Sequence, residues 1–171
     1  MAIRQVLAIP HTVLSTPTKP VAKISDFEFN LAQDLIDTMR ASPGCVGLAA
    51  NQIGIPLRAF ALDVSGHKKT TECHGLIVLF NPEIQTKQGV ETIREGCMSV
   101  PHFTADIPRA FEISLTGLTH EERPIEITTR GFEARAVLHE IDHLNGLVFL
   151  DRVTNPSNLF SRKVYLASPD R

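Results

Sequence analysis

The segment His139-Glu140-Ile141-Asp142-His143 contains the residue types and the spacing that a metal site on a helix requires. Residues four apart lie on one face of an α-helix, so the imidazoles of His139 and His143 can bind one ion. Glu140 lies between them, where its carboxylate can act as a general base without being a ligand. The motif therefore predicts a metal-dependent hydrolase, provided that a helix, a third ligand and oxyanion donors accompany it.

A catalytic metal site of this type needs three protein ligands and one open position. Cys97 is the best candidate for the third ligand, because it follows a predicted strand and Gly96 permits a tight backbone that would aim a thiolate inward. Taken alone, however, Cys97 is better interpreted as a small buried hydrophobic residue. Cys45 and the pair Cys73-His74 are competing candidates, although the residues around that pair are typical of an exposed loop. The other histidines lie near turns or charges and are expected to be solvated: His11, His67, His102 and His120.

Two long helices are predicted, and the second carries the metal motif. Ser25 and Glu28 form the capping pattern S-x-x-E, and apolar residues then recur every fourth position, which predicts an amphipathic helix over about 25–41. A helix over about 130–145, capped by Thr128 or Thr129, is apolar on most faces and is expected to lie buried between sheets. Two histidines and a glutamate in such a helix are costly without partners, which favours metal binding over hydrogen-bonded core histidines.

Several short strands are predicted between and around these helices: Leu57–Val64, Leu76–Asn81, Gln88–Arg94, Phe111–Leu118 and Ile125–Thr128. Their links are too short for crossover helices, so we expect antiparallel pairing, with the third strand beside the second. The small residues of 44–54 are equally typical of a tightly packed loop or buried strand and of a segment that lines a ligand.

The expected fold class is α+β, with a central metal-binding helix surrounded by short antiparallel β-sheets. An N-terminal helix and a short C-terminal helix over Pro156–Leu166 complete it, in a single domain of residues 1–171.

Composition narrows the class of function. The chain has 171 residues and a net charge of −2, which argues against nucleic acid as the main ligand. Its three cysteines do not suggest a disulfide framework and favour a reducing compartment. No apolar run approaches a membrane span and no targeting segment is evident, so a cytoplasmic protein without a membrane partner is expected, with an organelle as the open alternative.

Three segments, in this order, resemble the signature motifs of peptide deformylases: Gly47–Gln52, Glu95–Ser99 and His139–His143. The resemblance runs from about Val6 to Val153. It implies an enzyme that removes the formyl group from the N-terminal formyl-methionine of newly made polypeptides and releases formate. It also implies that Cys97 joins His139 and His143 as the third ligand.

The resemblance assigns further roles. One divalent metal is implied, with Fe2+ native and Zn2+, Ni2+ or Co2+ as substitutes; its hydroxide attacks the formyl carbon, and Glu140 acts as general base and then acid. The amide of Gln52 and the backbone N–H of Met98 would hold the oxyanion. The residues expected along the substrate are Cys45, Val46 and Gly47.

The chain departs from the family pattern at several positions. Cys45 replaces a glycine, which could narrow the substrate groove, and Met98 replaces a leucine whose backbone alone is needed. Thr104 stands where many bacterial members carry an arginine that contacts the peptide. The tail has few basic residues, chiefly Arg162 and Lys163, so at most weak association with the ribosome is expected.

Asp142 is expected to pair with Arg109, and Glu95 to orient a ligand or a strand. Two other functions stay open. A zincin-type peptidase would need a third ligand beyond the helix, where Asp151 is the main candidate. The second open function is a non-enzymatic relative that binds a metal or a peptide. Cys45, which departs from the family pattern, is the main reason to retain it.

Overall fold

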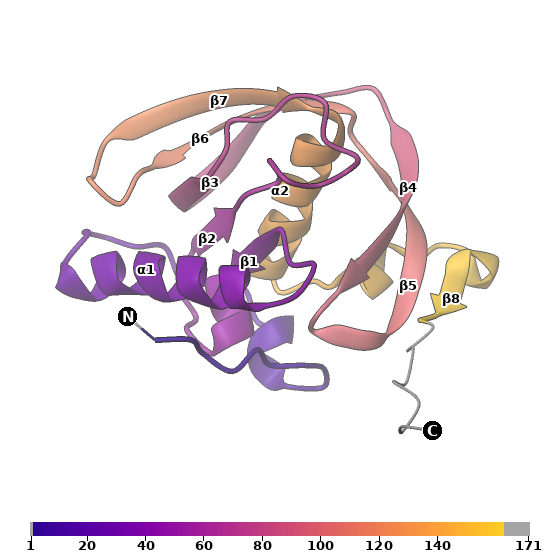
Figure 1. Cartoon of the computed structure of the whole chain (residues 1–171), viewed down its shortest axis with the longest axis horizontal. Helices are drawn as coiled ribbons and strands as arrows, with labels where there is room; N and C mark the ends of the chain where they lie inside the picture. The colour runs from indigo at the N-terminus through magenta and orange to yellow at the C-terminus, as the bar shows by residue number, and fades with distance from the viewer. Residues whose placement is uncertain (1, 163–171) are drawn as a thin grey trace, which may run out of the picture.

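A computed structural model of the chain describes residues 2–162, which have the α+β architecture expected from the sequence. In this part of the chain α2 lies between two antiparallel sheets, and α1 covers one side of the molecule (Figure 1). The two α-helices are α1 (Asp26–Ala41) and α2 (Gly131–Leu144). The strands are β1 (Gly47–Ala49), β2 (Ala59–Leu62), β3 (Ile77–Gln88), β4 (Glu91–Cys97), β5 (Val100–Arg109), β6 (Glu112–Leu118), β7 (Pro124–Arg130) and β8 (Leu159–Ser161). Over residues 2–162, none of the helices has the length and apolar character needed to cross a membrane.

Helix α1 begins and ends where the sequence predicts. The Ser25 hydroxyl accepts a hydrogen bond from the Phe27 N–H at 3.2 Å, and the Glu28 carboxylate accepts one from the Ser25 N–H at 2.9 Å. These bonds satisfy backbone donors that have no partner inside the helix. The apolar face of α1, including Leu31 and Leu35, is buried against β1 and β2.

Five strands form the larger sheet in the order β1-β2-β3-β6-β7, all antiparallel, so β1 is one of its edges. Four of these strands overlap the predicted ones, but β3 continues to Gln88. It does so past Pro82 through a shift in register between Phe80 and Glu83. The small-residue segment supplies β1 and the 3-10 turn Ala50–Ile53.

The smaller sheet has the order β4-β5-β8 and corrects two expectations. Of the residues predicted as a strand over Gln88–Arg94, Gln88 ends β3 and Glu91–Arg94 belong to β4, which pairs with β5 and not beside β3. The sequence does not predict β5, because Pro101 and Pro108 argue against a central strand. Strand β8 pairs with β5 only opposite Phe103–Ala105, so both prolines lie outside the stretch that has partners on both sides.

The expected C-terminal helix over Pro156–Leu166 is wrong for the described residues. Pro156–Asn158 is a 3-10 turn whose start is capped by the Asn155 side chain, and Leu159–Ser161 is β8. Pairing with β5 places Leu159 against a small apolar cluster of that sheet, which a local helix would not achieve. Residues 163–166 lie outside the described part.

Helix α2 matches its predicted span but not its predicted cap. Arg130 is the N-cap residue, without a side-chain bond, because β7 continues to that position. The Thr129 hydroxyl instead donates to Glu133 at 2.7 Å. The helix ends at Leu144, and Gly146 follows it with the expected left-handed φ of 75°. A side chain at Gly146 would also collide with the backbone of Thr16, since its Cβ would lie 2.8 Å from the Thr16 carbonyl carbon.

Candidate active site

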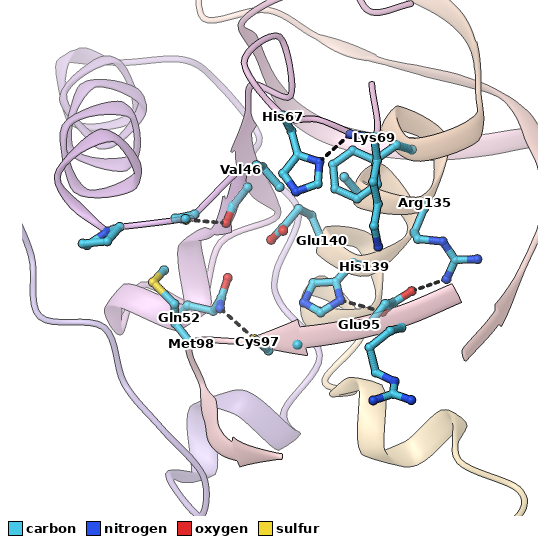
Figure 2. Close-up of a pocket in the computed structure, with 18 of the residues that line it drawn as sticks. Val46, Gln52, His67, Lys69, Glu95, Cys97, Met98, Arg135, His139 and Glu140 are labelled. Carbon is cyan, nitrogen blue, oxygen red and sulfur yellow. Dashed lines mark hydrogen bonds and ion pairs between the residues drawn. The ribbon is translucent and has the colours of Figure 1, made fainter. Parts of the chain in front are cut away.

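Helix α2 and strand β4 bring the three predicted metal ligands together. His139 and His143 lie one turn apart on α2, and Cys97 is the last residue of β4. The Cys97 Sγ lies 3.2 Å from the His143 Nε2, and one ligand atom from each residue lies within 4.8 Å of the others. Figure 2 shows His139 and Cys97 together at the base of the pocket. The geometry is that of a site with three ligands from the protein.

Neighbouring imidazoles control the charge of Cys97. Burial raises the pKa of its thiol, but His143 and His139 together lower that pKa well below its usual range. The side chain therefore favours the thiolate, the form in which cysteine binds metals.

Glu95 fixes the orientation of one ligand, as expected. Its Oε2 lies 3.0 Å from the Nδ1 of His139, so the other ring nitrogen of that histidine is left for a metal. The same carboxylate accepts hydrogen bonds from Arg109 at 2.5 and 2.9 Å and from Arg135 at 2.7 Å. Burial raises the pKa of Glu95, but the hydrogen bonds to His139 and Arg109 lower it well below its usual range, so the carboxylate stays ionised.

The expected pair between Asp142 and Arg109 is present, with a distance of 2.8 Å. Sequence reasoning missed two other arginines of this network. Arg152 also binds Asp142, at 2.6 Å, and Arg135 is buried beside Glu95. The sequence did contain a signal for Arg135. It lies four residues before His139, on the same face of a helix that is otherwise apolar, and a guanidinium buried there needs a carboxylate partner.

Glu140 lies at the base of the same pocket. Burial, the largest influence, raises its pKa to about 7, although the two histidines oppose this shift. Its Oε2 is buried and has no hydrogen-bond partner among residues 2–162, which fits a carboxylate whose partner is a metal-associated water. The backbone of Gly47 lies against its other oxygen, and a Cβ at Gly47 would stand 2.5 Å from the Glu140 Oε1. A side chain at position 47 would therefore force the Glu140 carboxylate to move.

The side-chain amide of Gln52 is held with its NH2 group toward the metal ligands. Its Oε1 accepts the Ala49 N–H at 2.9 Å, so its Nε2 must face the other way, 3.1 Å from Ser99 Oγ and 3.5 Å from Cys97 Sγ. Ser99 is fully buried and was not predicted; its hydroxyl fixes the amide that the motif provides. Met98 follows Cys97 and lines the same pocket.

These residues border a cavity of about 300 Å³. His67 is partly exposed, but its ring also stacks on Phe132, with 4.2 Å between the ring centroids, and both line the cavity, which the sequence did not predict. The small-residue segment lines another side through Cys45, Val46 and Gly47, so it supplies a strand and also part of the cavity wall. Figure 2 shows Gln52 and Met98 on the side opposite His67.

Two competing ligands do not join the cluster. The Cys45 thiol donates to the Gly47 carbonyl at 3.1 Å, and burial raises its pKa to about 12, so it stays protonated. Asp151 accepts the Val148 N–H at 2.8 Å, as the cap of a 3-10 turn. In the described residues the metal-ligand group contains neither of them, which removes the structural basis for a zincin-type site.

Comparison with known proteins gives one consistent family. The sequence model of polypeptide deformylase matches residues 3–158. The peptide deformylase of Halothermothrix orenii is 40% identical over 153 residues, 90% of this chain and 95% of that protein. That of Aquifex aeolicus is 37% identical over 151 residues, 88% of each chain.

Solved structures agree. The peptide deformylase of Ehrlichia chaffeensis in complex with actinonin matches with a TM-score of 0.85 and 32% identity over 92% of both chains. The enzyme of Acinetobacter baumannii with Met-Ala-Ser bound matches with a TM-score of 0.81 and 29% identity, over 89% of this chain and 99% of that chain.

Proposed function

Because the chain belongs to the polypeptide deformylase family, it is a metal-dependent hydrolase that removes the formyl group from N-terminal formyl-methionine, and we propose the residues that perform this reaction. The observation that supports the assignment best is the meeting of Cys97, His139 and His143 beside the buried carboxylate of Glu140.

Cys97, His139 and His143 would hold one divalent ion. A thiolate with two imidazoles is a donor set that suits both Fe2+ and Zn2+. We propose Fe2+ as the native metal, with Ni2+ or Co2+ as active substitutes and Zn2+ as a less active one. When bound, such an ion lowers the pKa of a coordinated water and polarises the formyl carbonyl.

Glu140 is the proposed general base and acid. A carboxyl group whose pKa lies at about 7 can take the proton of the attacking water and return it to the departing amine at neutral pH. Gly47 leaves the space that this carboxylate needs. Glu140 thus links attack on the formyl carbon to release of the free methionine amine.

Gln52 and Met98 would stabilise the oxyanion. The Gln52 NH2 group already faces Cys97, and the Met98 N–H follows that ligand directly in the chain. Donors fixed before the reaction need no reorganisation when charge develops on the carbonyl oxygen. Ser99 contributes by holding the amide of Gln52.

The substrate backbone would run between two sheet edges. Strands β1 and β4 are edges of their sheets, and residues at or beside both strands line the cavity. An extended peptide can pair with such edges through its own backbone. Cys45, Val46 and Gly47 would border it on one side, and the methionine side chain would enter the part lined by Phe132 and Ala136. Because the substrate is a nascent polypeptide, weak ribosome association and a cytoplasmic location belong to this proposal.

The test is formate release from formyl-Met-Ala-Ser by protein loaded anaerobically with Fe2+ or Ni2+. We expect Glu140→Ala to reduce kcat by about 10²–10⁴-fold with its metal content unchanged. A fully loaded wild type without turnover would overturn the assigned roles and favour a binding relative. Cleavage of unformylated Met-Ala-Ser would instead indicate a peptidase.

A further inference from the structure

The lining of the cavity has an uneven distribution of charge. Its carboxylates are Glu95 and Glu140, both buried at the base. Its exposed charged side chains are all cationic: Lys69, Arg94 and Arg162. A ligand that extends from the base of the cavity toward solvent therefore meets positive charge.

Arg94 differs from the other two cations because it is already paired. Its guanidinium binds Asp106, with the closer contact at 2.6 Å, and stacks over the Phe160 ring at 3.5 Å from the centroid. Within residues 2–162, no carboxylate forms an ion pair with Lys69 or Arg162. These two are the cations that a ligand could neutralise.

Arg162 lies on the proposed path of the peptide. It follows β8, and its backbone N–H donates to the His102 carbonyl at 2.8 Å, which ties it to the smaller sheet. Its guanidinium covers Gly96, the residue just before the metal ligand Cys97; a Cβ at Gly96 would overlap it. A peptide that pairs with β4 must therefore pass this guanidinium.

Lys69 belongs to the loop between β2 and β3 and reaches over α2. Its ammonium lies 5.8 Å from the centroid of Phe132, the ring on which His67 stacks. The loop that carries Lys69 and His67 is fixed to α2, because the His74 ring and backbone N–H bind the buried Glu133 at 2.7 and 2.8 Å. In Figure 2 Lys69 reaches into the pocket on the side of His67, above His139.

We propose that Lys69 and Arg162 are specificity-determining residues that favour formyl-methionyl peptides with aspartate or glutamate at the second or third position. The inference rests on the proposed function, which places the formyl group at the base and the following residues toward the mouth. Successive side chains of an extended peptide point to opposite sides, so cations on two sides of the path can serve two positions. Both cations are flexible and exposed, which limits the preference to the size of a surface ion pair.

The test compares kcat/KM for C-terminally amidated peptides formyl-Met-X-Ala and formyl-Met-Ala-X, with X as Asp, Asn or Lys. Asp and Asn have nearly the same shape, so their ratio measures charge. At low salt we expect Asp to exceed Asn by about two- to five-fold at one position or both, through KM, and Lys to be the poorest. Salt should reduce this ratio toward one, because exposed charges are screened.

Two variants and a matched control assign the effect. Lys69→Gln and Arg162→Gln should each lower the Asp-to-Asn ratio toward one. Arg123→Gln removes the same charge from an exposed side chain in the β6–β7 turn, which does not line the cavity, and should keep the wild-type ratio.

Wild-type protein that cleaves Asn peptides as well as Asp peptides at both positions would overturn this inference alone. So would an Asp preference that survives both substitutions. Failure of the proposed function has a different result, since no formylated peptide, including neutral formyl-Met-Ala-Ala-amide, would then release formate.

Discussion

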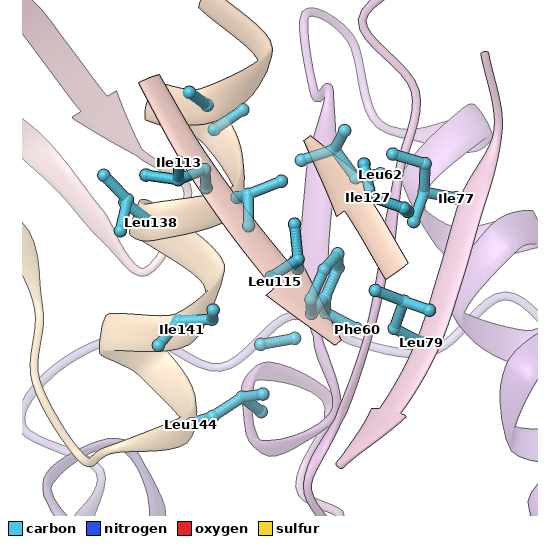
Figure 3. Close-up of a cluster of buried hydrophobic side chains, with 14 of the residues drawn as sticks. Phe60, Leu62, Ile77, Leu79, Ile113, Leu115, Ile127, Leu138, Ile141 and Leu144 are labelled. Carbon is cyan, nitrogen blue, oxygen red and sulfur yellow. The ribbon is translucent and has the colours of Figure 1, made fainter. Parts of the chain in front are cut away.

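The two sides of α2 are buried to a similar degree but by opposite means. Toward the five-stranded sheet, Val137, Ile141 and Leu144 belong to a cluster made of apolar residues, in which Phe60 and Leu115 are fully buried (Figure 3). Such contacts are not directional, and their strength follows the apolar area removed from water.

Toward the three-stranded sheet, α2 presents buried charges. Arg135 and His139 contact Glu95 of β4, and Asp142 contacts Arg109 of β5. Each of these groups depends on a partner of opposite charge, because an unpaired charge is costly in the interior. The apolar side therefore stabilises the helix, whereas the charged side fixes its rotation and the position of the proposed metal ligands. Substitutions on the two sides should fail in different ways.

Glu95→Gln should have the largest effect on stability of the changes considered, because one carboxylate serves three cationic or potentially cationic groups. Glutamine keeps the shape but leaves Arg109 and Arg135 with too little negative charge. We expect a loss of about 3–5 kcal/mol in the free energy of unfolding. Metal affinity should fall by about 10–100-fold, because His139 loses its anionic partner. Urea denaturation and competition with a chelator measure the two quantities.

Leu115→Ala probes the apolar side. The Leu115 side chain is 1% exposed, so truncation leaves a cavity and should cost about 3 kcal/mol of unfolding free energy. Metal affinity of the folded protein should match the wild type, since no ligand or ligand partner changes. If Leu115→Ala weakened metal binding as much as Glu95→Gln, the division between the two sides would be wrong.

Sequence patterns predicted the elements whose signals are local. The capping residues of α1 and the spacing of His139 and His143 lie within single helices, and the structure has both helices at the expected places. The pair Arg109–Asp142 was also expected, because a buried charge near a ligand needs a partner.

The rest depends on contacts between distant segments. Strand β5 was missed because Pro101 and Pro108 weaken the local pattern, although β8 pairs only between them. The membership of β4 in the second sheet follows from its register with β5, which no local pattern encodes. His67 was expected in solvent because its neighbours are polar, yet Phe132 of α2 offers a ring on which it stacks.

Asp34→Asn tests a buried carboxylate away from α2. Burial alone would raise the pKa of Asp34, but hydrogen bonds from Arg4 and from the Ala2 N–H lower it below its usual value. A lowered pKa adds stability at neutral pH, and this contribution is lost as pH falls through the ordinary value of about 3.9 and below. Arg4 is half exposed, so we expect a cost of only about 1 kcal/mol at pH 7.

The free energies of unfolding of Asp34→Asn and wild type should therefore differ at pH 7 and converge as pH falls below the lowered pKa of Asp34. Metal affinity should not change. A constant difference at all pH values would show that packing, and not the charge of Asp34, is responsible.

Cys45→Ala should have the smallest effect, although Cys45 lines the active-site cavity. Its protonated thiol makes one weak hydrogen bond, to the Gly47 carbonyl, and takes no part in the charged network. Alanine retains a Cβ, so the groove keeps its shape near the backbone; we expect a stability loss below about 1 kcal/mol. Deformylation should change by less than about five-fold, since such a bond is worth under about 1 kcal/mol in either state of the reaction. Thermal unfolding and kcat/KM for formyl-Met-Ala-Ser provide the measurements. A loss of unfolding free energy as large as that of Glu95→Gln would mean that the Cys45 side chain holds the segment before β1 in place. Single polar contacts would then be critical outside the charged side of α2 as well.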